Sequence, residues 1–372
     1  MDFEPSDDQA MLAESVDRFG RDEWPIAERP LLLRQSGADG VGKLWEKMAG
    51  LGWLMLPFSE EQGGLGGNSS DVMVIANGVG KHLIPVPFAS NIVLISSLLK
   101  SSDNEFVERV ANGSIRVALA LGDGDSRFEH LRVSTTARED GDGYILSGQK
   151  NFVPDGADAD FFIIPARTSG AGAELEGISL FLLPRARLEK NIESFRSVDN
   201  HRHSKIILAD IEVPADTILG TLGGGGMPLG MAVKASILAQ CAEAVGAMDA
   251  LCEITLEYLK TRSQFGKPIG TFQALQHRMV DMQIATEEAR AITMRATLES
   301  DAGVLDKGRM ASAAKARVGQ TSLFVARQAI QLHGGIGTSD EAVISHYLRR
   351  LTMLDMTFGN ADHHLARFAS WS

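Results

Sequence analysis

Hydrophobic residues recur at helical spacing over the first third of the chain. In "SDDQAMLAESVDRFGRDEW" the apolar residues Met11, Leu12, Val16 and Phe19 fall on one helical face, and Ser6 with the two aspartates after it forms a plausible N-cap. The segments "KLWEKMAGLG" and "DVMVIANGVGKHLIPVPFASNIVLISSLL" predict further helices, separated by a loop rich in glycine. We therefore expect helices up to about residue 112.

The spacing changes to that of strands near Gly113. Short apolar or alternating runs such as "IRVALALGDG", "YILSGQKNFV" and "GISLFLLPR" are separated by turns rich in Gly and Asp, among them "EDGDGY". This pattern predicts a β domain over residues 113–218.

Helical spacing returns after the glycine run at 223–226. A long helix is predicted from Leu229 to Arg262, and further helices over 271–300, 306–333 and 341–368. One face of the long helix is apolar and holds Val233, Ile237, Cys241, Val245, Met248 and Cys252. Helices and strands are segregated and no strand–GxGxxG–helix unit occurs, so the pattern indicates an α+β fold and not a Rossmann fold. The predicted domains are 1–112, 113–218 and 219–372.

Composition and charge narrow the class of protein. The 372 residues are 44% hydrophobic and 23% charged, as in ordinary globular proteins. A net charge of −12 argues against nucleic acid or an anionic membrane as the main partner, although Arg349 and Arg350 could bind an anion locally. Cys241 and Cys252 have neither disulfide nor metal-ligand spacing. This cysteine usage fits a reducing cytoplasm best. No targeting signal or apolar run of membrane-spanning length is visible.

Two glycine-rich stretches could contact a phosphate. "LGGGGMPLG" is either a nest of amide donors or a flexible connector, and the connector is favoured. "QLHGGIG", residues 331–337, follows a helical run and is equally typical of a helix C-cap and of a close approach to a ligand.

A third segment, "YLKTRSQFGKPIGTFQALQHRMVDM", joins two predicted helices. Arg262 offers a guanidinium for a pyrophosphate, Phe265 an aromatic face, and the glutamines offer amides around a Gly/Pro turn. A helical hairpin with a polar surface is the alternative.

Near the end of the chain, "FGNADHHL" places an aspartate beside two histidines. His363 and His364 are sequential and would point about 100° apart on a helix, which is poor geometry for one metal ion. We therefore expect no metal site here.

Two long motifs carry a family resemblance. "RSQFGKPIGTFQALQHRMVDM" and "QLHGGIGTSDEAVISHYLRRL" resemble the two signature regions of the acyl-CoA dehydrogenase family, in the same order and at the same separation. "WEKMAGLGWLMLPFSEEQGGLGG" and "DGDGYILSGQKNFVPDGADADFFI" resemble its N-terminal and middle domains. The resemblance implies an N-terminal helical domain, a middle β-barrel domain and a C-terminal four-helix bundle. It also implies FAD held at a subunit interface of a dimer or tetramer.

The resemblance also implies which residues contact FAD. We call the residues that, by this resemblance, would hold the pyrophosphate and adenosine end of the neighbouring subunit's FAD the clamp residues: Arg262, Gln264, Phe265, Ile269, Gln273, Gln331, Gly334 and Gly335. Near the flavin ring, Phe152 and Pro154 stand where the family has Trp and Thr, so one hydrogen bond to the ring is missing or rebuilt. Asn360 and Asp362 match the family's Thr and Gln and can still form hydrogen bonds.

The catalytic base departs from the family pattern. Phe358 stands where the family's usual glutamate removes the substrate's α-proton, and Ser236 stands at the other position that some relatives use. Phenylalanine cannot accept a proton. Glu243 is the nearest acid on the same helix as Ser236 and is the candidate base, although pairing with a basic neighbour is the favoured interpretation.

Two hypotheses follow. In the first, the chain is an FAD-dependent acyl-CoA dehydrogenase that forms an α/β heteromer with a homologous chain, which supplies the base. Its "FGNADHH" ending resembles the pimeloyl-CoA-dehydrogenase-like small subunits. In the second, the chain is a catalytically silent subunit that retains the fold. The resemblance also implies an acyl-CoA substrate and an electron-transferring flavoprotein as the electron acceptor. A homo-oligomer is the other possible assembly. The acyl group stays open between dicarboxylic, steroid side-chain and fatty acyl groups.

Overall fold

The computed structural model describes residues 4–26, 28, 41–124, 126–172, 174–304 and 308–371. These residues form two compact units, and each unit combines distant segments of the chain. Unit 1 comprises residues 1–44, 68–86 and 237–372, and unit 2 comprises residues 45–67 and 87–236. A helix over residues 41–50 and the long helix α7 each pass from one unit to the other. The sequential domain boundaries at residues 112 and 218 stay a prediction.

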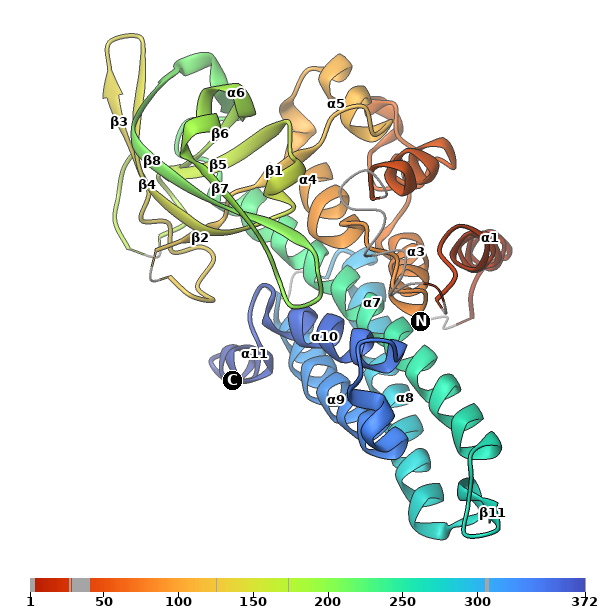
Figure 1. Ribbon diagram of the computed structural model, residues 1–372. Helices are drawn as coiled ribbons and strands as arrows, with labels where there is room; N and C mark the ends of the chain where they lie inside the picture. The colour runs from red at the N-terminus through yellow and green to blue at the C-terminus, as the bar shows by residue number, and fades with distance from the viewer. Residues whose placement is uncertain are drawn as a thin grey trace. The chain divides into compact units, whose positions relative to one another are not determined.

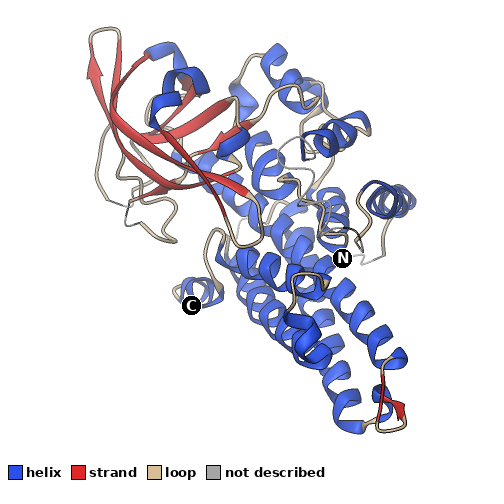
Figure 2. Ribbon diagram, in the orientation of Figure 1, coloured by secondary structure: helices blue, strands red, loops and turns tan. Residues whose placement is uncertain are grey.

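Unit 1 is helical (Figures 1 and 2). Its elements are α1 (Asp7–Glu23), α3 (Ser69–Lys81), most of α7 (Gly226–Thr261), α8 (Gln273–Asp301), α9 (Arg309–His333), α10 (Val343–Met356) and α11 (Ala361–Ala369), with short 3-10 turns η7 (Ile269–Thr271) and η8 (Gly334–Thr338). The predicted N-cap is confirmed, because Ser6 and Gln9 form a reciprocal capping box. The predicted long helix is also confirmed.

Helices α3 and α7 approach each other through two glycines. A Cβ atom at Gly80 would lie 1.8 Å from the carbonyl oxygen of Glu243, and one at Gly246 would lie 1.9 Å from that of Asn77. No larger residue fits either position without moving a backbone, so these glycines fix the helix crossing.

The single helix predicted over 341–368 is wrong. The structure has two helices, α10 and α11, separated by a turn at residues 357–360. Phe358 has φ +59° and Gly359 has φ +108°, and neither value is compatible with a right-handed helix. The chain therefore changes direction where the family resemblance places its base.

Unit 2 contains the predicted β domain (Figure 2). Its strands are β1 (Val117–Leu119), β2 (Gly122–Asp123), β3 (Thr136–Asp140), β4 (Gly143–Pro154), β5 (Phe161–Arg167), β6 (Ile178–Pro184), β7 (Ile192–Arg196), β8 (Arg202–Pro214) and β9 (Ile218–Leu219). They form one sheet in the order β7-β8-β4-β3-β5-β6-β9, with β1 beside β5 and β2 beside β4. Most pairs are antiparallel, whereas β5 pairs in parallel with β1 and with β3. The α+β prediction is confirmed.

Short helices complete unit 2. They are η1 (Glu60–Gln62), the π-helix η2 (Phe88–Val93), α4 (Leu94–Ser96), η3 (Leu99–Ser101), α5 (Asn104–Ala111), η4 (Gly156–Asp158), α6 (Arg185–Leu188), η5 (Glu189–Asn191) and η6 (Ala215–Thr217). A two-stranded hairpin, β10 (Ser263–Gln264) and β11 (Lys267–Pro268), belongs to unit 1.

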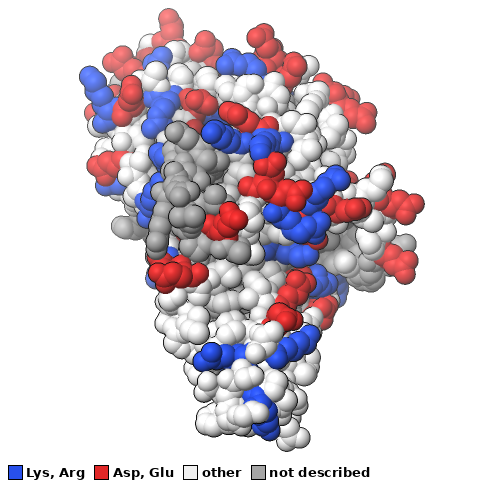
Figure 3. Space-filling model, turned by 45° about the vertical axis from the view of Figure 1, so that its right-hand side comes forward, with Lys and Arg blue, Asp and Glu red and all other residues white. Residues whose placement is uncertain are grey.

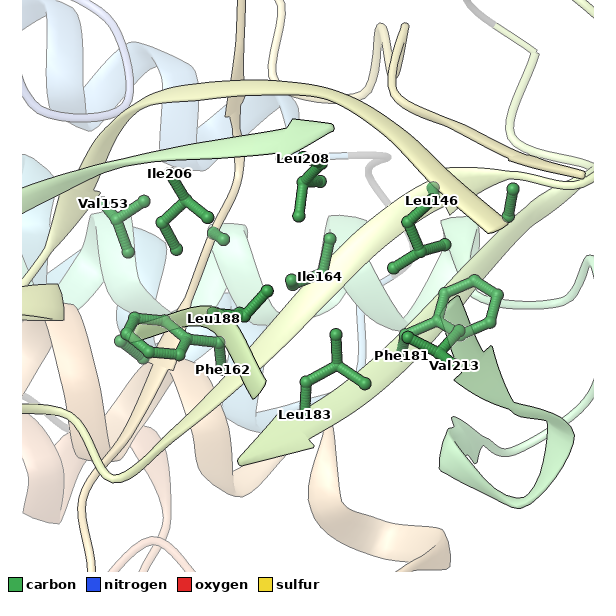
Figure 4. Packing of buried hydrophobic residues seen from close by; sticks show 14 of the residues in the cluster. Leu146, Val153, Phe162, Ile164, Phe181, Leu183, Leu188, Ile206, Leu208 and Val213 are labelled. Atoms are coloured by element: carbon green, nitrogen blue, oxygen red, sulfur yellow. The ribbon is translucent and has the colours of Figure 1, made fainter. Parts of the chain in front are cut away.

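The core of the β domain is apolar and lies between its curved strands. Figure 4 shows Leu146, Ile164, Phe181 and Leu208 pointing toward one another from β4, β5, β6 and β8. Each of them is at most 2% exposed. Burying such side chains contributes about 1.5–3 kcal/mol each, so this cluster is a main source of the domain's stability.

One ion pair lies inside this domain. Lys150 is fully buried, and its Nζ lies 2.7 Å from Asp123 Oδ1 and donates to the carbonyl oxygen of Pro165. Asp123 also accepts hydrogen bonds from both the backbone and the hydroxyl of Thr135. Every polar group of the pair therefore has a partner, as a buried charge requires.

The glycine run at 223–226 is a connector, but a packed one. Gly223 donates to the hydroxyl of Ser179, and Gly225 donates to the carbonyl of Ile178 in β6. Flexibility is thus not the reason for these glycines, and α7 begins at the last of them, Gly226.

Helix α7 is long and apolar enough by composition to cross a membrane. However, 89% of its most apolar window is buried inside the structure, so packing explains its apolar character. On the face that Figure 3 shows, acidic and basic side chains are interspersed.

Candidate functional site

The clamp residues begin at the hairpin between α7 and α8. Ser263 pairs with Pro268 and Gln264 with Lys267, which leaves Phe265 and Gly266 as a two-residue turn. Both turn residues have positive φ, at +54° and +78°. Such turns match the twist of the strands they join, so the hairpin presents its side chains in a defined way.

Phe265 is strained and exposed. Its side chain is 90% exposed although it is a large aromatic, and its left-handed backbone is uncommon outside glycine. The ring has one edge-to-face contact, with Phe272 at 6.1 Å between centroids, and Lys267 lies over Phe272. A large aromatic side chain that is exposed to solvent on a strained backbone indicates a binding surface.

Polar side chains surround this aromatic ring. Arg262, Gln264 and Gln273 are all exposed, and Ile269 is partly buried at the start of the turn before α8. Within the described part of the chain Arg262 forms no ion pair, so its guanidinium is available to an anion.

The second group of clamp residues ends α9. Gly334 has φ +65° and ψ −146°, and its N–H caps the helix by donating to the carbonyls of Ile330 and Gln331. The C-cap interpretation of "QLHGGIG" is therefore confirmed. A Cβ atom at Gly335 would meet nothing within 4 Å, so the packing of the chain itself does not require glycine there. That open backbone also fits the close approach of a bound group.

Two aromatic rings bring these segments to the same end of unit 1. Tyr258, in the last turn of α7, stacks on His333 with 4.3 Å between ring centroids, and its hydroxyl donates to the His333 carbonyl. Burial lowers the pKa of His333, which keeps its ring neutral. The sequence did not predict that Tyr258 and His333 join the two clamp segments, because only their tertiary contact reveals this.

The turn at 357–360 answers the question raised by the two histidines. His364 is fully buried; its Nε2 bonds the carbonyl of Phe358 at 2.9 Å and its Nδ1 bonds Ser312 Oγ in α9. Asn360 caps α11 by accepting from the backbone of His363, which leaves its amide N–H₂ for other partners. Asp362 is exposed in the first turn of α11. His364 therefore holds the turn in place through these two hydrogen bonds.

Acid should destabilise the fold by favouring protonation of His364. Burial, and secondarily the charge of Lys315, lower the pKa of His364 from 6.5 to about 3. The unfolded chain takes up this proton near pH 6.5 and the folded chain does not, so stability is lost as the pH falls below 6.5. We expect a loss of about 2 kcal/mol from this group between pH 7 and pH 5.

Urea unfolding at both pH values checks this expectation. His364→Gln should lose much less stability than the wild type over the same interval. Equal losses in wild type and His364→Gln would contradict the assignment.

The candidate base Glu243 is paired. Its side chain is buried, and its Oε1 lies 2.7 Å from Nε and 2.6 Å from Nη2 of Arg350 in α10. The expected pairing with a basic neighbour is thus confirmed, and Arg350 is not a surface anion site. Ser236 donates to the carbonyl of Ala89 at 2.7 Å. Phe358 is 5% exposed and carries no titratable group.

Phe152 belongs to unit 2 and the clamp residues to unit 1. Its ring lies 4.4 Å from that of His203 and 6.1 Å from that of Phe195, in the β7–β8 hairpin. Pro154 pairs with His203 at the end of β4. These contacts hold the residues that the resemblance assigns to the flavin ring. Within the described residues no group of His, Cys, Asp and Glu has the arrangement of a metal site.

Family comparisons agree with this architecture along nearly the whole chain. The acyl-CoA dehydrogenase N-terminal domain matches residues 6–113, the middle domain residues 118–211 and the C-terminal domain residues 232–372. The chain therefore belongs to the acyl-CoA dehydrogenase family of oxidoreductases.

Particular relatives cover almost all of the chain. L-prolyl-[peptidyl-carrier protein] dehydrogenase of Serratia sp. (strain ATCC 39006) is 30% identical over 94% of this chain and 93% of its own length. The solved FAD complex of PigA is 26% identical, with a TM-score of 0.89 and coverage of 100% of this chain and 99% of that one. A variant of the steroid acyl-CoA dehydrogenase Tcur3481-Tcur3483 is 26% identical, with a TM-score of 0.84 and coverage of 98% and 97%.

Proposed function

We propose that this chain binds FAD and takes part in the α,β-dehydrogenation of an acyl thioester. When bound, FAD supplies the acceptor for the hydride from the β-carbon. The observation that carries the proposal is the exposed, strained Phe265 beside the available guanidinium of Arg262. Together with the open backbone at Gly335, these groups fit the aromatic and diphosphate parts of a dinucleotide.

The residues of this chain would divide the binding between them. Arg262 would neutralise the diphosphate and Phe265 would cover an apolar face, while Gln264, Gln273 and Gln331 would bond polar edges. Ile269 would add apolar contact, and Gly334 and Gly335 would let the backbone come close. At the flavin end, Asn360, Asp362 and Phe152 would bound the ring.

We further propose that the proton acceptor comes from a homologous partner chain. Phe358 has no basic atom, and both guanidinium nitrogens that contact Glu243 hold its carboxylate in place. The paired name of the steroid enzyme Tcur3481-Tcur3483 supports an assembly of two chains. The substrate would be a thioester of CoA or of a carrier protein, as the name of the Serratia relative suggests, and an electron-transferring flavoprotein would reoxidise the flavin in the cytoplasm.

A catalytically silent subunit is the second candidate. Phe358 at the usual base position favours it, because the same clamp residues could hold a flavin that reacts only in the partner. Substitution of this chain's own flavin-end residue Asn360 by Ala in the intact heteromer separates the two candidates. Flavin reduction should slow if this chain's own flavin reacts, and it should stay unchanged if the chain is silent.

Removing the guanidinium of Arg262 should weaken FAD retention. A charged hydrogen bond contributes about 1.5–3 kcal/mol, so Arg262→Ala should raise the Kd for FAD by about 10-fold to 150-fold. Flavin fluorescence titration of the apoprotein, alone and with the partner chain, measures this. Arg278→Ala is the matched control, because Arg278 is exposed on α8 and contacts Gln328 outside the clamp. Equal retention in both variants, or a protein that binds no FAD at all, would overturn the proposal.

A further inference from the structure

A buried amide in unit 2 has no hydrogen-bond partner. Asn91 is 1% exposed, and neither its Nδ2 nor its Oδ1 has a partner among the residues that the structure describes. Leaving one such buried polar group without a partner destabilises a protein by about 1–3 kcal/mol. A ligand that supplies the missing bonds would explain why this position holds asparagine.

The local backbone is as unusual as the side chain. Asn91 lies in the π-helix η2 (Phe88–Val93), whose other buried residues are apolar: Phe88, Ala89, Ile92 and Val93. Single turns of π-helix are rare and occur frequently at functional sites. The helix thus places one polar group among apolar side chains, which is the usual composition of a small-molecule site.

Two hydrogen bonds join η2 to elements of the proposed reaction site. Ser90 Oγ donates to Asp155 Oδ2 at 2.8 Å, directly after Pro154 at the end of β4. Ser236 Oγ of α7 donates to the carbonyl of Ala89 at 2.7 Å. Asn91 follows these two contact residues in the chain, so its amide lies on the element that links β4 to α7.

We propose that Asn91 determines substrate specificity by bonding a neutral oxygen on the acyl chain, a ketone or a hydroxyl. This inference rests on the proposed function, since it needs an acyl thioester at the same site. The amide can both donate to and accept from such an oxygen. A carboxylate is disfavoured, because Asp155 is the charged side chain that the described contacts place beside η2 and a buried anion needs a cationic partner.

The test uses Asn91→Leu, a substitution of similar size, in the FAD-loaded protein with its partner chain. The probes are heptanoyl-CoA and its 4-, 5- and 6-oxo derivatives, with binding followed by the shift of the flavin absorbance spectrum. In the wild type at least one oxo derivative should bind about tenfold more tightly than heptanoyl-CoA. In Asn91→Leu that preference should disappear, while the affinity for heptanoyl-CoA stays equal or rises.

Stability provides the second readout. Because no described residue pairs with the amide, Asn91→Leu should raise the urea midpoint of the ligand-free protein. Asn77→Leu is the contrast, since Asn77 donates to the carbonyl of Ala242, and it should lower the midpoint.

Four outcomes would overturn the inference. A lower midpoint for Asn91→Leu means that the amide already has a partner, such as a water molecule. Equal binding of oxo and plain thioesters by the wild type, or a preference that survives Asn91→Leu, removes Asn91 from specificity while the proposed function stands. If no thioester perturbs the flavin spectrum, the proposed function fails and the inference fails with it.

Discussion

Lys150→Met is expected to destabilise the protein by about 3–5 kcal/mol, because it leaves the carboxylate of Asp123 buried without its cation. Lys150 is fully buried and joins Asp123 on β2 to the Pro165 carbonyl on β5. Burial lowers the pKa of Lys150 and the charge of Asp123 opposes that shift. The methionine would also leave the Pro165 carbonyl without its donor.

Urea unfolding followed by circular dichroism measures this loss. Lys205→Met is the matched control, since Lys205 is partly exposed and lies 3.8 Å from Glu193, so its loss should stay below about 1 kcal/mol. The double variant Asp123→Asn/Lys150→Met should recover part of the stability, because no unpaired charge remains. A single Lys150→Met variant as stable as the control would show that the pair does not hold the domain together.

This pair shows what periodicity alone does not reveal. The strand pattern predicted the β domain, because alternating apolar residues need one buried face. It did not pair Asp123 with Lys150, which are neighbours only through the register between β2 and β4. Side-chain partners across a sheet depend on register, and one sequence does not specify it directly.

In helical unit 1, too, the sequence predicted the elements but not the tertiary contacts between them. The long helix α7 was predictable, since its apolar residues recur over many turns. The turn at Phe358 was missed, because apolar spacing continues across it and positive φ values leave little mark in a sequence. The pairing of Glu243 with a basic residue was predicted, but its partner Arg350 stands on another helix and was identified only by the fold.

The candidate clamp is the part that depended most on resemblance. The residues themselves allowed either a polar hairpin or a ligand site. The structure adds the exposed Phe265 ring, the open backbone at Gly335 and the stacking of Tyr258 on His333. Exposure and stacking are tertiary properties, which explains why they could not be predicted from local pattern.

The largest effect on activity should come from the partner chain. Expressed alone and loaded with FAD, this chain should reduce its flavin with an acyl-CoA at least 10²–10⁴-fold more slowly than the reconstituted pair, the range that a positioned general base contributes. Rapid-mixing measurements of flavin bleaching give both rates. In the reconstituted heteromer, Glu243→Gln should leave the rate of flavin reduction and the FAD content unchanged. Its only effect should be a loss of stability, because the ion pair with Arg350 is removed.

Phe358→Glu tests the same idea from within this chain. Position 358 stands in a turn that His364 holds through its backbone carbonyl, so a new side chain there changes the chemistry without removing that contact. The glutamate should restore part of the α-proton abstraction in the isolated chain, provided that its own flavin site is complete, and Phe358→Gln should restore none. If the isolated wild-type chain is instead fully active and loses that activity in Glu243→Gln, then Glu243 is the base. Full activity of the isolated chain that survives Glu243→Gln would contradict both the partner-base hypothesis and the assignment of Glu243. In that case the proton acceptor would be neither a residue of the partner chain nor Glu243.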